Sequence, residues 1–212
     1  MTVPTVKQRI QTHLRQSIET KQQMLRETIP AIEAAALAIV DTFFKRGGIV
    51  YTFGNGGSAA DAQHIAGELL CMLRTDNNFD FRLPLPAHAL TTDTSVMSAV
   101  ANDLGFEFVF SRQLEALAKP EDLVIAISTS GNSPNVVKAL ELTKARGIQS
   151  VAFTGRDGGT LRNLADILIA IPADDVALIQ EGHVTAFHSM CDVMEELLFG
   201  SKGLRVTKGK NQ

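Results

Sequence analysis

The chain has 212 residues and a formal net charge of −3, from 20 basic and 23 acidic side chains. This near-neutral balance argues against a dedicated nucleic-acid or membrane-surface protein, and 45% hydrophobic against 20% charged residues excludes a disordered chain. Two cysteines are too few for a disulfide scaffold and no apolar run is long enough to cross a bilayer, so we expect a soluble, cytoplasmic protein.

The N-terminal segment has the pattern of two helices. Apolar residues recur at helical spacing over residues 6–26, and Pro30 suits the first turn of a second helix that continues to Gly47. The apolar faces of these helices are wider than one side of a small sheet can cover. We therefore assign residues 1–47 to a helical arm that serves homo-oligomer assembly.

Five short apolar runs follow this arm. They are IVYTF (49–53), AHAL (87–90), LVIAI (123–127), SVAFT (150–154) and ILIAI (167–171). Their length and β-branched content are typical of buried parallel strands. Crossover helices are expected over residues 58–73, 105–118 and 134–146, and a last helix over residues 176–198.

This alternation predicts an α/β fold, with a doubly wound, mainly parallel sheet of four or five strands flanked by helices. The predicted domain spans residues 48–200. The polar, basic residues 201–212 are expected to form a flexible tail.

Two turns that directly follow predicted strands could hold a phosphate. GNGGSAADA (54–62) has glycines that let backbone N–H groups approach a ligand, and a helix N-terminus follows it. STSGNSPN (128–135) offers the hydroxyl groups of Ser128, Thr129, Ser130 and Ser133. Neither turn has the Gly-Lys-Ser/Thr ending of a nucleoside-triphosphate loop, so both favour the phosphate of a sugar or small metabolite over simple tight turns.

A nicotinamide dinucleotide site is the competing interpretation of the first turn. Gly54, Gly56 and Ala59 loosely fit the glycine fingerprint of such sites. The acidic residue expected about twenty positions further on has no clear counterpart, because Asp76 and Asp80 lie in a polar connection. The dinucleotide interpretation is therefore the weaker one.

Two helices carry groups suited to metal or acid–base chemistry. His64 and Glu68 have the i,i+4 spacing that puts both on one helix face, where they can bind a metal, transfer protons or form an ordinary polar pair. The last helix carries Gln180, His183 and His188. Gln180 and His188 lie about 12 Å apart along a straight helix, so one ion binds both only at a bent or frayed first turn or from different chains. Spacing alone does not choose between His183 and His188.

Taken together, the motifs resemble the SIS domain family of sugar isomerases, and within it the phosphoheptose isomerases. The matching segments run in family order through most of residues 5–200: GNGGSAADAQHIAGEL (54–69), LTTDTSVMSAVANDLGFEFVFSRQ (90–113), AISTSGNSPNV (126–136), TGRDGG (154–159) and IQEGHVTAFH (179–188). STSGNS alone marks the superfamily, whereas its combination with QHxxxE and QExHxxxxH is more specific. The resemblance implies a flavodoxin-like SIS fold with five strands and a cytoplasmic homotetramer with active sites near subunit interfaces.

The resemblance also implies a role for individual residues. It assigns one zinc ion per subunit to His64, Glu68, Gln180 and His188, and an acid–base pair to Glu68 and His188, whereas His183 receives no role. The implied substrate-binding residues are Asn55, Gly56, Gly57, Glu68, Asn102, Asp103, Ser128, Thr129, Ser130, Ser133 and Gln180.

The implied reaction is an aldose–ketose isomerisation. It converts D-sedoheptulose 7-phosphate to D-glycero-D-manno-heptose 7-phosphate through an enediol, in heptose biosynthesis for lipopolysaccharide or other glycoconjugates. Three positions depart from the family pattern: Val176 and Leu178 stand where Thr and Arg are common, and Met72 stands where some members have a basic residue. These departures concern recognition of the far end of the sugar.

A non-catalytic SIS binding module is the alternative function. The DnaA initiator-associating protein, which acts in replication initiation, shares the loops but lacks counterparts of Glu68 and His188. Both residues are present here, which favours the enzyme.

Overall fold

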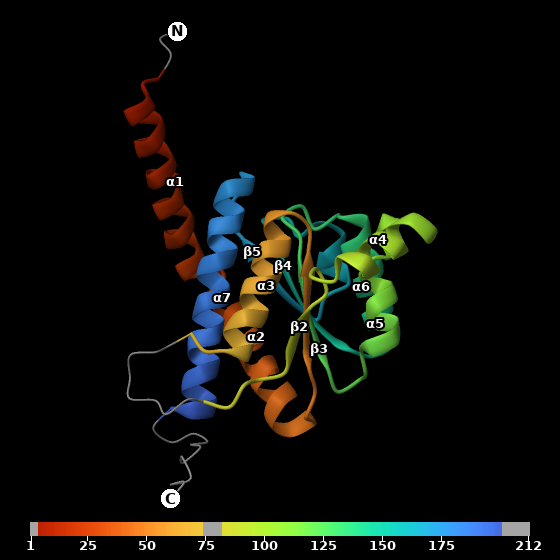
Figure 1. Cartoon of the computed structure of the whole chain (residues 1–212). Coiled ribbons are helices and arrows are strands. Elements are labelled where there is room, and N and C mark those ends of the chain that lie inside the picture. Colours follow the sequence, from red (N-terminus) through yellow and green to blue (C-terminus); the bar gives the residue numbers. More distant parts are fainter. Residues whose placement is uncertain (1–3, 74–81, 201–212) are drawn as a thin grey trace, which may run out of the picture.

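The computed structural model of the chain describes residues 4–73 and 82–200. The predicted tail over residues 201–212, together with Asp76 and Asp80 of the dinucleotide alternative, lies outside the described residues. One parallel sheet forms the centre of the molecule (Figure 1). Its strands are β1 (Val50–Gly54), β2 (Ala87–Ala89), β3 (Leu123–Ile127), β4 (Gln149–Gly155) and β5 (Ile167–Ile171).

The strand order is β2-β1-β3-β4-β5, which confirms the predicted doubly wound α/β fold. The chain moves from β1 outward to β2, then returns to β3 on the other side of β1 and continues to β5. The order therefore reverses between β1 and β3. In doubly wound sheets, the loops that leave the strands at such a reversal form the ligand crevice.

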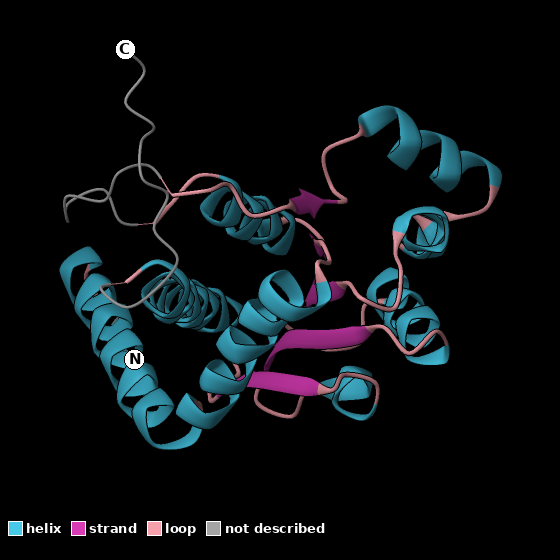
Figure 2. Ribbon diagram, turned by 90° about the horizontal axis from the view of Figure 1, so that it is seen from below, coloured by secondary structure: helices cyan, strands magenta, loops and turns pink. Residues whose placement is uncertain are grey.

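Seven α-helices surround the sheet in the described part of the chain. They are α1 (Val6–Glu27), α2 (Ile29–Asp41), α3 (Gly57–Leu70), α4 (Thr94–Asp103), α5 (Ser111–Leu117), α6 (Pro134–Ala145) and α7 (Val176–Phe199). Helices α2, α3 and α7 cover one face, while α5 and α6 cover the other (Figure 2). The alternation along β3 explains both layers, because Leu123, Ile125 and Ile127 point to the first face and Val124 and Ala126 to the second.

Two predicted helices differ from the observed ones. The second N-terminal helix is α-helical only to Asp41 and continues as a π-helical turn over Thr42–Arg46, where the Thr42 hydroxyl donates to the Ala38 carbonyl at 2.8 Å. A side chain that competes for this carbonyl loosens the helical ladder. The single helix predicted over residues 105–118 is wrong. Gly105 has a φ of 111°, which no α-helix accommodates, and it separates α4 from a 3₁₀ turn and α5.

Two helices are incompletely covered by the rest of the chain. Helix α1 extends away from the sheet (Figure 1), and one side of it exposes Val6, Ile10, Leu14, Ile18 and Leu25. Helix α4 lies at the periphery and has no buried residue. Among the described helices, none combines the length and apolar character that a membrane span requires.

Candidate functional site

The two phosphate-loop candidates lie side by side at the reversal of strand order. Gly54 at the end of β1 pairs with Ile127 at the end of β3, so both loops leave the sheet at the same edge. A Cβ on Gly54 would lie 2.8 Å from the Ile127 carbonyl oxygen and 2.8 Å from the Ser58 Cβ. Glycine at this position is therefore required for α3 to begin directly beside β3.

The second loop presents hydroxyl groups at the start of α6. The Oγ atoms of Ser128 and Ser133 are 3.0 Å apart, Ser128 is buried, and Ser130 is exposed. Ser133 is the N-cap residue and Pro134 opens the helix. Because a helix N-terminus and hydroxyl groups both favour anions, this loop has the chemistry of a phosphate site.

A reciprocal amide pair joins the two loops, and the sequence interpretation missed one of its members. Nδ2 of Asn55 donates to Oδ1 of Asn135 at 2.8 Å, and Nδ2 of Asn135 donates to Oδ1 of Asn55 at 2.8 Å. Asn135 is almost completely buried. It is the last residue of the STSGNSPN motif, whose hydroxyl groups are the predicted phosphate ligands.

Three side chains from α3 and α7 converge in a second cluster. His64 Nε2 lies 3.0 Å from Glu68 Oε1 and 3.3 Å from His188 Nε2. One nitrogen or oxygen of each residue lies within 4.8 Å of the others. The predicted acid–base residues Glu68 and His188 therefore lie in one cluster, with His64 between them.

The geometry of this cluster fits a zinc ion. Two nitrogens bound tetrahedrally at about 2.05 Å are about 3.4 Å apart, close to the separation of the two Nε2 atoms. Two imidazoles and a carboxylate are also a common set of protein ligands for zinc. The fourth predicted ligand, Gln180, lies against the start of α3, where a Cβ on Gly57 would be 2.3 Å from Gln180 Nε2. Gly57 thus leaves the space that Gln180 occupies.

His183 has a different environment from His188. It is completely buried, with its ring nearly perpendicular to that of Phe153, and its Nε2 lies 3.1 Å from the Thr154 carbonyl oxygen. Burial lowers the pKa of His183 to about 4, although the hydrogen bond to Thr154 acts in the opposite direction. His183 is therefore neutral and donates from Nε2, and Nδ1 has no hydrogen-bond partner among the described residues.

The remaining predicted residues lie apart from the His64 cluster or at the edge of the loops. Asn102 donates to Asp103 at 2.7 Å, and both are exposed at the end of α4. Gly56 is exposed between β1 and α3 with a φ of 55°. The Thr129 carbonyl accepts from the Gly155 N–H at 2.9 Å, which ties the hydroxyl loop to the end of β4.

Asp61 is a further acidic residue that the sequence interpretation missed. It lies on α3 one turn before His64, and burial raises its pKa, partly opposed by the nearby His64. Its Oδ2 atom is buried and has no hydrogen-bond partner among the residues that the structure describes. A partly buried carboxyl with a raised pKa, next to a cluster of candidate metal ligands, is typical of functional sites.

Comparisons with known proteins agree with this arrangement. The family described as the SIS domain matches residues 12–155. The phosphoheptose isomerase of Trichlorobacter lovleyi is 48% identical over 179 residues, which cover 84% of this chain and 88% of that protein.

Two solved structures share the fold over most of the chain. The phosphoheptose isomerase GmhA of Neisseria gonorrhoeae has a TM-score of 0.83 at 38% identity, and a phosphoheptose isomerase of Francisella tularensis has a TM-score of 0.84 at 36% identity. Each comparison covers 91% of this chain and 100% of the other chain.

The amide pair between the loops is testable by a double-mutant cycle. Asn135→Ala leaves a half-buried amide without its partner, so we expect it to lower the free energy of unfolding by about 1–3 kcal/mol. Adding Asn55→Ala to Asn135→Ala should lower the free energy of unfolding only a little further. Urea denaturation of the single and double variants should therefore give a coupling energy between the two residues of about 1 kcal/mol or above. Asn132→Ala combined with Asn55→Ala is the control and should be additive, because Asn132 accepts from Thr160 instead. Additivity of the Asn55 and Asn135 changes would contradict the pair.

The buried imidazole of His183 predicts a pH-dependent stability. Its folded pKa is lowered from 6.5 to about 4, so its stabilising contribution is complete above pH 6.5 and is lost as the pH falls toward 4. His183→Gln retains an amide donor near Thr154 but does not titrate. Between pH 6.5 and pH 4, we expect the free energy of unfolding of this variant to fall by on the order of 1–3 kcal/mol less than that of the wild-type protein. His88→Gln, at an exposed position of β2, controls for the loss of one histidine, and an unchanged slope in His183→Gln would refute the assignment.

Proposed function

The chain belongs to the SIS domain family and, within it, to the phosphoheptose isomerases, and from this premise we propose that it converts D-sedoheptulose 7-phosphate to D-glycero-D-manno-heptose 7-phosphate. The chain is a sugar-phosphate isomerase. One observation carries the proposal: Glu68 and His188, on separate helices, converge with His64 in one cluster. A carboxylate and an imidazole that share a site are the two groups that an aldose–ketose isomerisation needs.

The hydroxyl loop acts as the anchor of the substrate in this mechanism. The hydroxyl groups of Ser128, Thr129, Ser130 and Ser133, with the N-terminus of α6, bind the phosphate. Asn55 and the glycines Gly56 and Gly57 line the sugar, and Asn102 and Asp103 contact it from α4. Anchoring one end of a flexible linear sugar orients the other end toward the reacting groups, and this supplies positioning rather than chemistry.

The proton transfers fall to Glu68 and His188. The Glu68 carboxylate removes a proton from C1 of the ketose and returns it to C2. His188 donates a proton to the oxygen on C2 while the enediol forms, and removes the proton from the oxygen on C1 as the aldehyde forms. The two steps balance, because each group ends in its starting protonation state.

His64, Glu68 and His188 would hold a zinc ion at this site, with Gln180 as the fourth ligand. Bound there, the ion would act as a Lewis acid toward the carbonyl oxygen of the substrate. Because α7 is continuous from Val176, Gln180 lies in neither a bend nor a frayed turn, and it remains about 12 Å from His188 along the helix. This separation supports a site in which Gln180 comes from a second copy of the chain.

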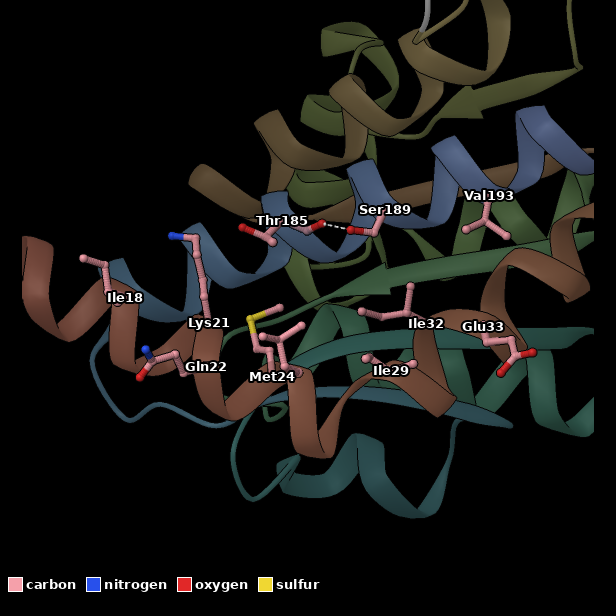
Figure 3. A pocket seen from close by; sticks show the side chains of 11 residues that line it. Ile18, Lys21, Gln22, Met24, Ile29, Ile32, Glu33, Thr185, Ser189 and Val193 are labelled. Carbon is pink, nitrogen blue, oxygen red and sulfur yellow. Dashed lines mark hydrogen bonds between the residues drawn. The ribbon is translucent and has the colours of Figure 1, made fainter. Parts of the chain in front are cut away.

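A homotetramer is the assembly that we propose, and the N-terminal arm supports it. Helices α1, α2 and α7 enclose an apolar groove of about 690 Å³, into which Met24, Ile32 and Val193 project (Figure 3). The exposed apolar stripe of α1 runs into this groove at Ile18. A second copy of α1 has the matching apolar surface, and its docking would cover both.

The cellular role follows as part of the same proposal. A cytoplasmic phosphoheptose isomerase would supply heptose for lipopolysaccharide or another glycoconjugate. The non-catalytic binding module is not favoured, because the relatives are isomerases and both reacting residues are present.

Glu68→Gln tests the chemistry. With zinc in excess, we expect kcat in a coupled isomerase assay to fall by about 10³-fold, since an amide cannot accept the proton. Sugar-phosphate affinity measured by calorimetry should change only a few-fold, because the hydroxyl loop is intact. Glu141→Gln on the exposed side of α6 is the control. Wild-type turnover by Glu68→Gln would remove Glu68 from the mechanism, and an inactive wild-type protein with added zinc would overturn the proposed function.

Charge on the α1 stripe tests the assembly. We expect Ile10→Asp with Leu14→Asp to reduce the tetramer to smaller species in light scattering at micromolar concentration, because buried aspartates oppose the contact. The loss of assembly should also abolish turnover if Gln180 acts across subunits. Thr12→Asp with Gln16→Asp adds the same charge to the opposite face of α1 and should leave the tetramer intact. A monomeric wild-type protein would contradict the assembly.

A further inference from the structure

A buried ion pair lies between the end of α3 and the second half of α7, outside the residues used so far. Arg82 Nε donates to Glu195 Oε1 at 2.8 Å, and the two side chains are only 3% and 8% exposed. No other ion pair between described residues is buried on both sides to this degree. Arg82 also lies over the Phe199 ring, 5.5 Å from its centre. The pair lies between α3 and α7, and both of these helices carry residues of the proposed site.

Arg82 caps the C-terminus of α3 with its remaining donors. Nη1 donates to the Leu69 carbonyl at 2.9 Å and to the Leu83 carbonyl at 3.1 Å, and Nη2 donates to the Glu68 carbonyl. The last carbonyls of a helix have no partner within the helix, and a cation there is favoured by the helix dipole. Glu195 Oε1 also accepts from the Leu73 N–H at 2.8 Å, just beyond the end of α3.

The contacts of Arg82 and Glu195 are the last of several contacts between the neighbouring helices α3 and α7 (Figure 1). At the start of α3, Gly57 faces Gln180; in the middle, His64 meets His188; beyond the end, Leu73 meets Glu195. The helices therefore run parallel. Glu195 lies seven residues after His188, two turns further on the same side of α7 and about 10.5 Å along its axis.

The energetics argue for a positioning role. Burying two charges costs desolvation free energy, and well-packed apolar side chains of similar volume often give equal or greater stability. Stability alone therefore does not account for the pair. A planar guanidinium that donates to both α3 carbonyls and to Glu195 defines one placement of the two helices, whereas apolar contacts would tolerate sliding.

We propose that Arg82 is a positioning residue that holds the Glu68 end of α3 at a fixed place on α7, and so sets the separation between the Glu68 carboxylate and the His188 imidazole. Glu68 connects Arg82 directly to the His64 cluster, because its backbone carbonyl accepts from Arg82 while its carboxylate lies 3.0 Å from His64. The part of this inference that concerns turnover rests on the proposed function. The part that concerns the convergence of His64, Glu68 and His188 does not.

Cobalt binding and kinetics together test the inference. Arg82→Met keeps the length of the side chain and removes its donors. We expect it to weaken Co²⁺ binding to metal-free protein by about 10–100-fold in a titration followed by visible absorption, as for other residues that orient metal ligands. With metal in excess, kcat should fall about tenfold or more while KM changes less than about threefold, because the phosphate is held by the hydroxyl loop on β3 and α6.

Two further variants and one control complete the experiment. Arg82→Lys should recover part of the affinity, because an ammonium can donate to the α3 carbonyls without the planar fork. Glu195→Gln keeps an oxygen acceptor and should show a smaller loss than Arg82→Met. Leu140→Ala removes a buried side chain of α6 on the opposite face of the sheet and should lower Tm without changing Co²⁺ affinity or kcat.

The possible results separate the alternatives. A folded Arg82→Met protein with wild-type Co²⁺ affinity and kcat would overturn the inference, and so would equal losses in Leu140→Ala. If Arg82→Met does not fold, unchanged affinity in both Arg82→Lys and Glu195→Gln would overturn it. A wild-type protein without isomerase activity, whose Co²⁺ affinity still falls in Arg82→Met, would support the positioning role and refute the proposed function.

Discussion

The parallel pairing of β1 with β3 is the constraint from which the site follows. It brings together two loops whose joined residues, Asn55 and Asn135, are 80 positions apart in the chain. Because the strand order reverses at this pair, α3 and α6 leave for opposite faces of the sheet, which is the position where doubly wound sheets bind ligands. Gly54 permits this close approach, since any side chain there would collide with the Ile127 carbonyl.

The placement of α3 against α7 is the second level of organisation. Both helices pack on the same face of the sheet through buried apolar residues such as Ile65, Leu69 and Phe187. Such contacts supply most of the free energy of packing but specify the axial position weakly. The polar contacts at His64 and at the end of α3 add the directional part. The fold therefore combines an apolar contact that holds the helices together with hydrogen bonds that define where along each other they lie.

The exposed apolar surface indicates where the molecule remains incomplete. The stripe on α1 and the groove beside α2 lie on the side of α7 that is away from the sheet, and α4 has no buried residue in the single chain. His64, which belongs to the cluster with Glu68 and His188, is exposed too. A site whose ligands reach the surface beside an uncovered apolar groove is suited to completion by another copy of the same chain.

Local patterns in the sequence determined the strands, the two loops and most helix boundaries. Short apolar runs, rich in β-branched residues at every strand except β2, predicted all five strands. The glycine- and hydroxyl-rich turns after β1 and β3 were predicted from composition, because their chemistry is contained in consecutive residues. The helix predicted over residues 105–118 is wrong because Gly105, with its positive φ, interrupts it. Asp93 caps α4 through the Val96 N–H, and an aspartate at this position is a local sequence signal for the start of a helix.

Only the tertiary structure decided which side chains meet. His183 and His188 are about 140° apart around one helix, so the packing of α7 against Phe153 and Thr154 turned the first into the core and left the second for the His64 cluster. The side-chain partners Asn55 of Asn135 and Glu195 of Arg82 lie 80 and 113 positions away. Asn135 belongs to the STSGNSPN motif, but the motif does not say which residue its amide meets, and no motif contains Arg82. Local periodicity reports which face of an element is buried, whereas a hydrogen bond across elements depends on the relative placement of segments that no short stretch of sequence contains.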